Sequence, residues 1–67
     1  MAKTATPKRI VSLITKHGFI FLRQKGSHAI YTDKKGVLII VPMHTKEISK
    51  GTLGRILKAA GLTVKDL

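Results

Sequence analysis

A histidine that follows a short basic turn is the residue of this chain best suited to acid–base chemistry. The turn is Lys25-Gly26-Ser27, and His28 comes directly after it, at the start of a β-prone run. Imidazole is the one side chain whose unperturbed form changes charge near neutral pH. The neighbouring lysine and the backbone N–H groups of Gly26 and Ser27 would hold a phosphate beside the ring. We therefore interpret this stretch as the outline of a metal-free nuclease or of a phosphate-binding site.

Cleavage of RNA is a reaction that these residue types suit, because RNA carries its own nucleophile. The 2′-hydroxyl attacks the adjacent phosphorus when a base removes its proton and cations stabilise the charge of the transition state. His28 is the candidate base, and Lys25 or another cation of the turn is the candidate for charge stabilisation. His44 follows in a polar connector and would protonate the leaving 5′-oxygen only if the connector folds towards His28.

The same residues also have plainer structural interpretations, which stay open at this point. His28 would simply pack near Ile30 if its strand face were covered. Tyr31 fits cross-strand packing better than base stacking. Gly51-Thr52 fits a helix start and close packing better than a phosphate site. His17, in the last turn of a helix, fits a surface residue that interacts with the helix dipole.

The net charge predicts a polyanionic partner. The 67 residues include 13 Lys and Arg against 3 Asp and Glu, a formal charge of +10 that is spread along the chain. Solubility alone needs a net charge of only about 2 to 8. RNA is the polyanion that fits the chemistry above, and the residues expected to bind it are Lys25, Gly26, Lys46 and Lys50.

Composition also argues against several kinds of site. Cysteine is absent and only three residues are acidic, so we expect neither a metal site nor a cofactor. The clearest apolar run, residues 37–41, is far shorter than the ~20 residues of a membrane span, and no membrane association is expected. Residues 1–6 are a short polar segment with no hydrophobic stretch behind it, so no signal peptide is evident and we expect a cytoplasmic protein.

Hydrophobic periodicity predicts two helices and three strands in one domain that spans residues 1–67. Thr6-Pro7 is a helix start, and Gly18 ends the helix. Residues 19–24, 28–32 and 37–41 have the composition of strands. A second helix follows Gly51 and ends at Gly61, and Thr63 with Asp66 fits the cap of a short last helical turn.

The predicted architecture is α+β, in the order α-β-β-β-α of a double-stranded RNA-binding domain. Two amphipathic helices would cover one face of a three-stranded antiparallel sheet. The helix residues expected in the core are Ile10, Leu13, Ile14, Leu53, Ile56 and Leu57. Element order by itself does not assign a function. A non-catalytic module that binds double-stranded RNA therefore stays as the alternative. Specific DNA binding is not expected, since no helix-turn-helix pair is evident.

Several fragments, taken in order, resemble the HicA family of toxins, also called YcfA-like proteins. The resemblance runs from about Pro7 to the C-terminus. The fragments are Gly26-Ser27-His28 with Tyr31, Val41-Pro42 with His44, Lys50-Gly51-Thr52-Leu53 with Ile56-Leu57, and Ala60-Gly61-Leu62. Each fragment is weakly specific, and their order and spacing together carry the resemblance.

The resemblance implies a toxin of a type II toxin–antitoxin pair. Such a toxin is an mRNA interferase, a ribonuclease that cuts messenger RNA and is held inactive by a HicB-type antitoxin. The resemblance also implies a fold like that of a double-stranded RNA-binding domain and catalysis by one histidine, which maps onto His28. Lys25, Ser27 and His44 are the candidates for catalytic support.

Overall fold

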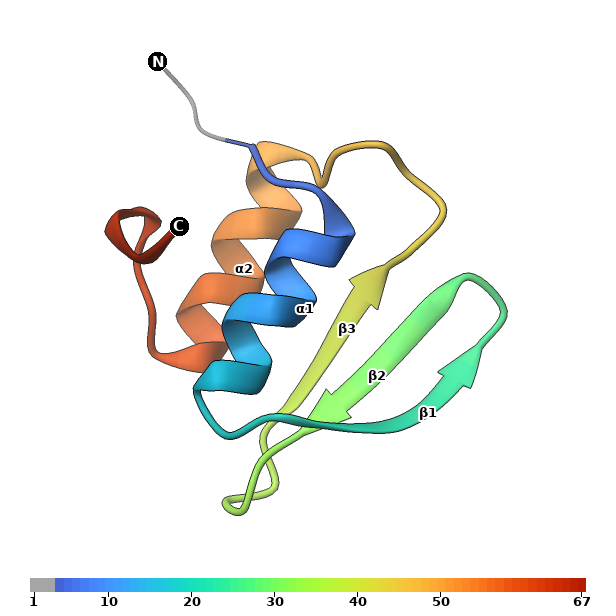
Figure 1. Cartoon of the computed structure of the whole chain (residues 1–67), viewed down its shortest axis with the longest axis vertical. Coiled ribbons are helices and arrows are strands. Elements are labelled where there is room, and N and C mark those ends of the chain that lie inside the picture. Colours follow the sequence, from blue (N-terminus) through green and yellow to red (C-terminus); the bar gives the residue numbers. More distant parts are fainter. Residues whose placement is uncertain (1–3) are drawn as a thin grey trace.

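The N-terminal helix begins where the sequence predicts it. A computed structural model describes residues 4–67, so the short polar segment of residues 1–6 lies partly outside the described residues. Helix α1 spans Pro7–Lys16, with Pro7 at its first position (Figure 1). Thr6 caps it, because its side-chain oxygen accepts a hydrogen bond of 3.2 Å from the backbone N–H of Arg9.

Three antiparallel strands follow in the spatial order β1-β2-β3. They are β1 (Ile20–Lys25), β2 (His28–Thr32) and β3 (Leu38–Pro42). Gly26 and Ser27 form the two-residue turn between β1 and β2, and Gly26 takes a φ of +60°, which suits a residue without a Cβ. The β1–β2 register shifts between Phe21 and Arg23, so β1 carries an irregularity near its middle.

A second turn, between β2 and β3, is organised by Asp33. Its carboxylate Oδ1 accepts hydrogen bonds from the backbone N–H groups of Lys35 (3.0 Å) and Val37 (2.9 Å). Gly36 has a φ of +85°, which returns the chain towards β3. This side chain–backbone turn explains why the Asp33-Lys34-Lys35-Gly36 run separates the two strands.

The C-terminal part contains helix α2 and one short turn. Helix α2 spans Lys50–Ala60 and ends at Gly61, whose φ of +74° is the left-handed conformation typical of a helix end. A 3-10 turn, η1, spans Val64–Asp66. Thr63 and Asp66 form the reciprocal hydrogen bonds of a capping box there, as their spacing predicts.

Both helices contact β3 and lie on the same face of the sheet, as predicted (Figure 1). The side chains of β3 alternate in burial: Ile39 and Val41 are buried under the helices, whereas Leu38 and Ile40 are exposed on the open face. The buried helix residues are Pro7, Ile10, Ile14, Leu53, Ile56 and Leu57. Leu13, which was also expected in the core, is only half-buried at its edge.

The N-terminal segment is fixed to the connector between β3 and α2. Ala5 pairs with Ile48 in an antiparallel bridge, and the Ile48 N–H donates to the Ala5 carbonyl over 2.8 Å. The side chain of Thr4 donates to the Glu47 carboxylate over 2.9 Å. Both Ala5 and Ile48 are buried, so this bridge belongs to the core. Sequence patterning does not predict it.

The remaining differences from the predicted elements are shifts of one or two residues. β1 and β3 each begin and end one residue later than predicted, so that Phe19 is a buried residue before β1 and Pro42 is the last residue of β3. Pro42 is compatible with this position because β3 is an edge strand. No helix of the described range is long and apolar enough to cross a membrane.

Candidate functional site

One surface pocket joins the sheet to helix α2 and contains the predicted histidine. It encloses about 350 Å³. The sheet contributes His28, Ile40 and Pro42, and α2 contributes Thr52, Arg55 and Ile56. His28 and Arg55 are both exposed to solvent, so a ligand can reach them without any movement of the protein. We call this the His28 pocket.

The position of His28 follows from the strand register. His28 is the first residue of β2, and it is paired with Lys25 of β1 and with Pro42 of β3. The next residue, Ala29, is buried on the helix-covered face, so the alternation of a strand places His28 on the open face. The interpretation in which His28 packs into a covered face is therefore wrong.

His44 lies beside His28, although the two residues come from different segments. The centroids of their rings are 6.0 Å apart and the ring planes meet at 71°. The backbone explains the arrangement: the N–H of Met43, next to His44, donates a 2.7 Å hydrogen bond to the carbonyl of Ser27, next to His28. The connector thus folds towards His28, which is the condition that the sequence left undecided.

Arg55 is the cation that the structure adds to the site. From the sequence it reads as a solvated residue on the outer face of a helix. It is exposed, yet it lines the His28 pocket together with Thr52 and Ile56. The spacing of these three residues shows that they share one face of α2. The sequence holds no signal that this face lies next to the start of β2.

Lys25 and the turn residues lie at the same end of the sheet as His28. Lys25 and His28 are directly opposite each other on neighbouring antiparallel strands, so their side chains leave the same face. Lys25 is exposed and Ser27 is half-buried. Gly26, between them, has no heavy atom within 4 Å of the position of a Cβ, which leaves the outside of the turn open.

The other two residues expected to bind RNA lie outside this pocket. Lys46 is exposed in the connector, and Lys50 is exposed at the first position of α2. Neither lines the His28 pocket. The structure therefore brings together His28, His44 and Arg55, with Lys25 beside His28 in register, and leaves Lys46 and Lys50 as separate surface cations.

The acidic side chains are engaged elsewhere. Asp33 accepts backbone hydrogen bonds in the β2–β3 turn, Asp66 accepts one from the N–H of Thr63 (2.8 Å), and Glu47 accepts one from the Thr4 hydroxyl. Within residues 4–67 no group of three or more His, Cys, Asp or Glu side chains is arranged to hold a metal ion. The polar side chains that line the His28 pocket are the imidazole of His28, the guanidinium group of Arg55 and the hydroxyl of Thr52.

Comparison with known protein families gives a match that spans most of the chain. A sequence model of the family described as "HicA toxin of bacterial toxin-antitoxin" matches residues 7–62, which include every residue of the His28 pocket and His44. No curated protein matches the chain significantly.

Proposed function

The chain belongs to the HicA toxin family of bacterial toxin–antitoxin systems, and on this basis we propose that it is a metal-independent endoribonuclease that cleaves mRNA with His28 as its catalytic residue. The observation that carries the proposal is that His28 is exposed, lies in one pocket with Arg55, and has the ring of His44 6.0 Å away. An imidazole of this kind is accessible to a ribose and to its phosphate.

In the proposed reaction, His28 acts as the general base. It takes the proton of the 2′-hydroxyl while the 2′-oxygen forms a bond to the adjacent phosphorus. The bond from phosphorus to the 5′-oxygen breaks, and His44 gives a proton to that oxygen. The products are a 2′,3′-cyclic phosphate and a 5′-hydroxyl, and water later opens the cyclic phosphate to a 3′-phosphate.

Arg55 supplies the charge that this reaction needs in the transition state. The phosphoryl oxygens gain negative charge as the 2′-oxygen attacks, and a guanidinium group donates two parallel hydrogen bonds to such oxygens. Lys25 adds a second positive charge on the strand next to His28. Arg55 therefore has the main role in stabilising the charge of the transition state, and Lys25 has a supporting role.

Family membership implies an antitoxin partner, and we propose that it is an acidic protein of the HicB type. A toxin of charge +10 attracts such a partner over a long range, which speeds association. Ile40, which is 53% exposed, lines the His28 pocket and offers an apolar contact to a protein surface. The antitoxin would then inhibit by covering His28. The activity would belong in the cytoplasm, where mRNA is available.

A binding module without catalysis is the second candidate function. It is favoured by the element order α-β-β-β-α, which is also the order of double-stranded RNA-binding domains. Such a module would bind duplex RNA by its shape and its phosphates and would leave the strands intact.

Analysis of the cleavage products distinguishes these functions. Purified protein is incubated with a labelled single-stranded RNA and, in parallel, with a labelled RNA duplex, each with and without EDTA. The nuclease proposal predicts fragments that end in a 2′,3′-cyclic phosphate or a 3′-phosphate, at the same rate with and without the chelator. A strict metal requirement contradicts the mechanism. Intact RNA that is bound but never cut supports the binding module.

A further inference from the structure

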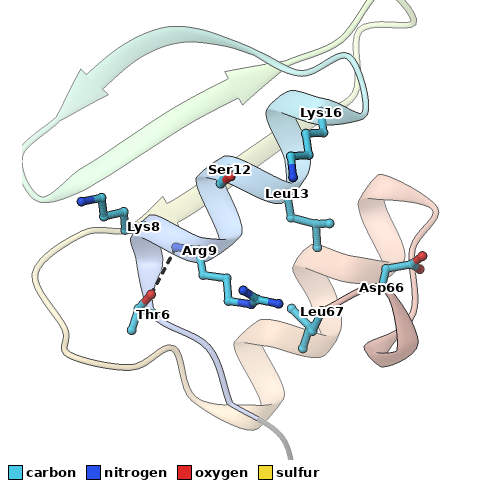
Figure 2. A pocket seen from close by; sticks show the side chains of 8 residues that line it. All are labelled: Thr6, Lys8, Arg9, Ser12, Leu13, Lys16, Asp66 and Leu67. Carbon is cyan, nitrogen blue, oxygen red and sulfur yellow. Dashed lines mark hydrogen bonds between the residues drawn. The ribbon is translucent and has the colours of Figure 1, made fainter.

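A second cleft, separate from the His28 pocket, lies between helix α1 and the C-terminal turn (Figure 2). It encloses about 360 Å³. One wall is the outer face of α1 with the residue before it, and the other wall is the end of the chain. The lining residues are Thr6, Lys8, Arg9, Ser12, Leu13, Lys16, Asp66 and Leu67. We call it the α1 cleft.

The charge in the α1 cleft is predominantly positive. Three cationic side chains, Lys8, Arg9 and Lys16, line the cleft together with one acidic side chain, that of Asp66. One oxygen of this carboxylate, Oδ2, already accepts a hydrogen bond of 2.8 Å from the backbone N–H of Thr63. The three cations are exposed, so they are available to a ligand. The cleft therefore favours an anion.

The spacing of the polar residues suits a chain of phosphates. Lys8, Ser12 and Lys16 are four residues apart, so they line up on one face of α1 over about 12 Å. A nucleic acid strand offers one phosphate per nucleotide at regular intervals. The only apolar side chains in the cleft are Leu13 and Leu67. A protein partner would be expected to find a larger apolar centre in its interface.

The α1 cleft and the His28 pocket share no lining residue and are built from different elements. We propose that the α1 cleft binds the phosphate backbone of the RNA substrate at nucleotides away from the bond that is cut. The inference rests on the proposed ribonuclease function. Contacts to the phosphate backbone position a nucleic acid without reading its bases. The cleft would therefore raise the affinity for RNA of any base sequence.

Three residues of the α1 cleft lie outside residues 7–62, the range that matches the family. They are Thr6 and, on the other wall, Asp66 and Leu67. The hydrogen bonds between Thr63 and Asp66 hold this wall in place. The depth of the cleft therefore depends on a turn that the family match does not include.

The test compares two triple variants that lose the same charge. Both are made in a His28→Ala background, so that binding is measured without cleavage. The first, Lys8→Gln with Arg9→Gln and Lys16→Gln, removes the cations of the α1 cleft. The control removes three exposed cations outside both pockets, with the substitutions Lys34→Gln, Lys35→Gln and Lys58→Gln.

The binding assay uses a 20-nucleotide single-stranded RNA over a series of salt concentrations. The α1 variant is expected to bind about tenfold or more weakly at low salt, and its slope of log affinity against log salt falls by about 2, as for three lost phosphate contacts. The control variant keeps most of the affinity and of the slope. Equal losses in the two variants overturn the proposal, because they show that only the net charge matters.

Substrate length gives a second measurement, on variants that retain His28. A dinucleoside phosphate fills the His28 pocket alone, so the α1 variant should cleave it as fast as the wild type does. With the 20-nucleotide RNA, the α1 variant should show a raised KM and an unchanged kcat. Equal defects with both substrates overturn the proposal. An absence of cleavage by the wild type counts against the proposed function, and the binding assay still decides the inference.

Asp66→Asn tests the cleft in the opposite direction. An amide oxygen still accepts the hydrogen bond from Thr63, while the opposing charge is removed, so RNA should bind a few-fold more tightly. An unchanged affinity counts against the cleft. Binding of a polyglutamate peptide at the same salt is measured in parallel. If the α1 triple substitution abolishes binding of the peptide but leaves binding of the RNA unchanged, the cleft is a site for an acidic protein and the proposal is overturned.

Discussion

The imidazole rings of His28 and His44 are arranged edge to face beside the start of β2, with their centroids 6.0 Å apart. One ring comes from the start of β2 and the other from the connector after β3. The hydrogen bond between Met43 and Ser27 holds the two segments together. Two imidazoles at this separation are able to act on opposite sides of one phosphodiester, one as base and one as acid.

His44→Ala tests whether the second ring donates the proton to the leaving group. We expect cleavage of RNA to slow by about 10²-fold, the lower end of the range for general acid catalysis. A substrate with a p-nitrophenolate leaving group, such as a nucleoside 3′-(p-nitrophenyl phosphate), needs no such proton. The variant should therefore cleave it at nearly the wild-type rate.

His17→Ala is the control for this prediction, because His17 is an exposed histidine at the end of α1 that lines neither pocket. Its rate on both substrates should equal that of the wild type. If His44→Ala slows both substrates equally, His44 only positions the pocket or the substrate. If it slows neither, His44 has no part in the reaction.

Arg55→Gln tests the charge that faces the phosphoryl group. Loss of one donor to the transition state is expected to lower kcat/KM by about 10²-fold. Arg55→Lys should recover only part of it, because an ammonium group lacks the planar pair of donors. Lys58→Gln, one turn further along α2 and outside the pocket, is the control. Equal rates for Arg55→Gln and Lys58→Gln would exclude the assigned role.

The fold is largely predictable from local signals in the sequence. Thr6-Pro7 and Gly61 mark helix ends because a cap and a left-handed residue are local requirements. The apolar run of residues 38–41 marks a strand, but only the structure shows that Ile39 and Val41 are its buried members. The bridge between Ala5 and Ile48 is not predictable in this way. It joins two segments that lack a periodic pattern, so only the tertiary structure brings them together.

The candidate site is predictable only in part, for the same reason. The pairing of His28 with Lys25 follows from the tight turn at Gly26. The exposure of His28 is not predictable from alternation alone, because Ile30, on the same face of β2, is buried. The approach of His44 depends on a backbone hydrogen bond between residues distant in sequence, and the role of Arg55 depends on how α2 crosses β3. Helical spacing predicts that Thr52, Arg55 and Ile56 share one face of α2, but it does not predict which part of the sheet this face contacts.

The turn that precedes His28 requires a residue with positive φ. Gly26→Ala should lower the free energy of unfolding by about 1–2 kcal/mol, the cost of a left-handed conformation for a residue with a Cβ. Gly54→Ala is the opposite control: Gly54 lies within α2 with open space around its Cβ position, so alanine should stabilise by about 0.5–1 kcal/mol. Urea denaturation followed by circular dichroism measures both. Equal effects of the two substitutions would contradict the turn geometry.

The turn between β2 and β3 depends on one carboxylate. Asp33→Ala leaves the N–H groups of Lys35 and Val37 without their acceptor, and we expect a loss of about 1–2 kcal/mol of stability. Asp33→Asn keeps an acceptor oxygen at the same place and should lose much less. Thermal unfolding monitored by calorimetry distinguishes them. If the two variants are equally stable, these hydrogen bonds do not organise the turn.

The central claim is that one exposed imidazole performs the reaction, and His28→Ala tests it most directly. Cleavage of a labelled RNA and equilibrium binding of the same RNA are measured on the wild type and the variant, with circular dichroism to verify the fold. We predict that the variant binds the RNA with nearly the wild-type affinity and that its cleavage rate falls by at least about 10²-fold. Cleavage at the wild-type rate by a correctly folded His28→Ala protein would contradict the account.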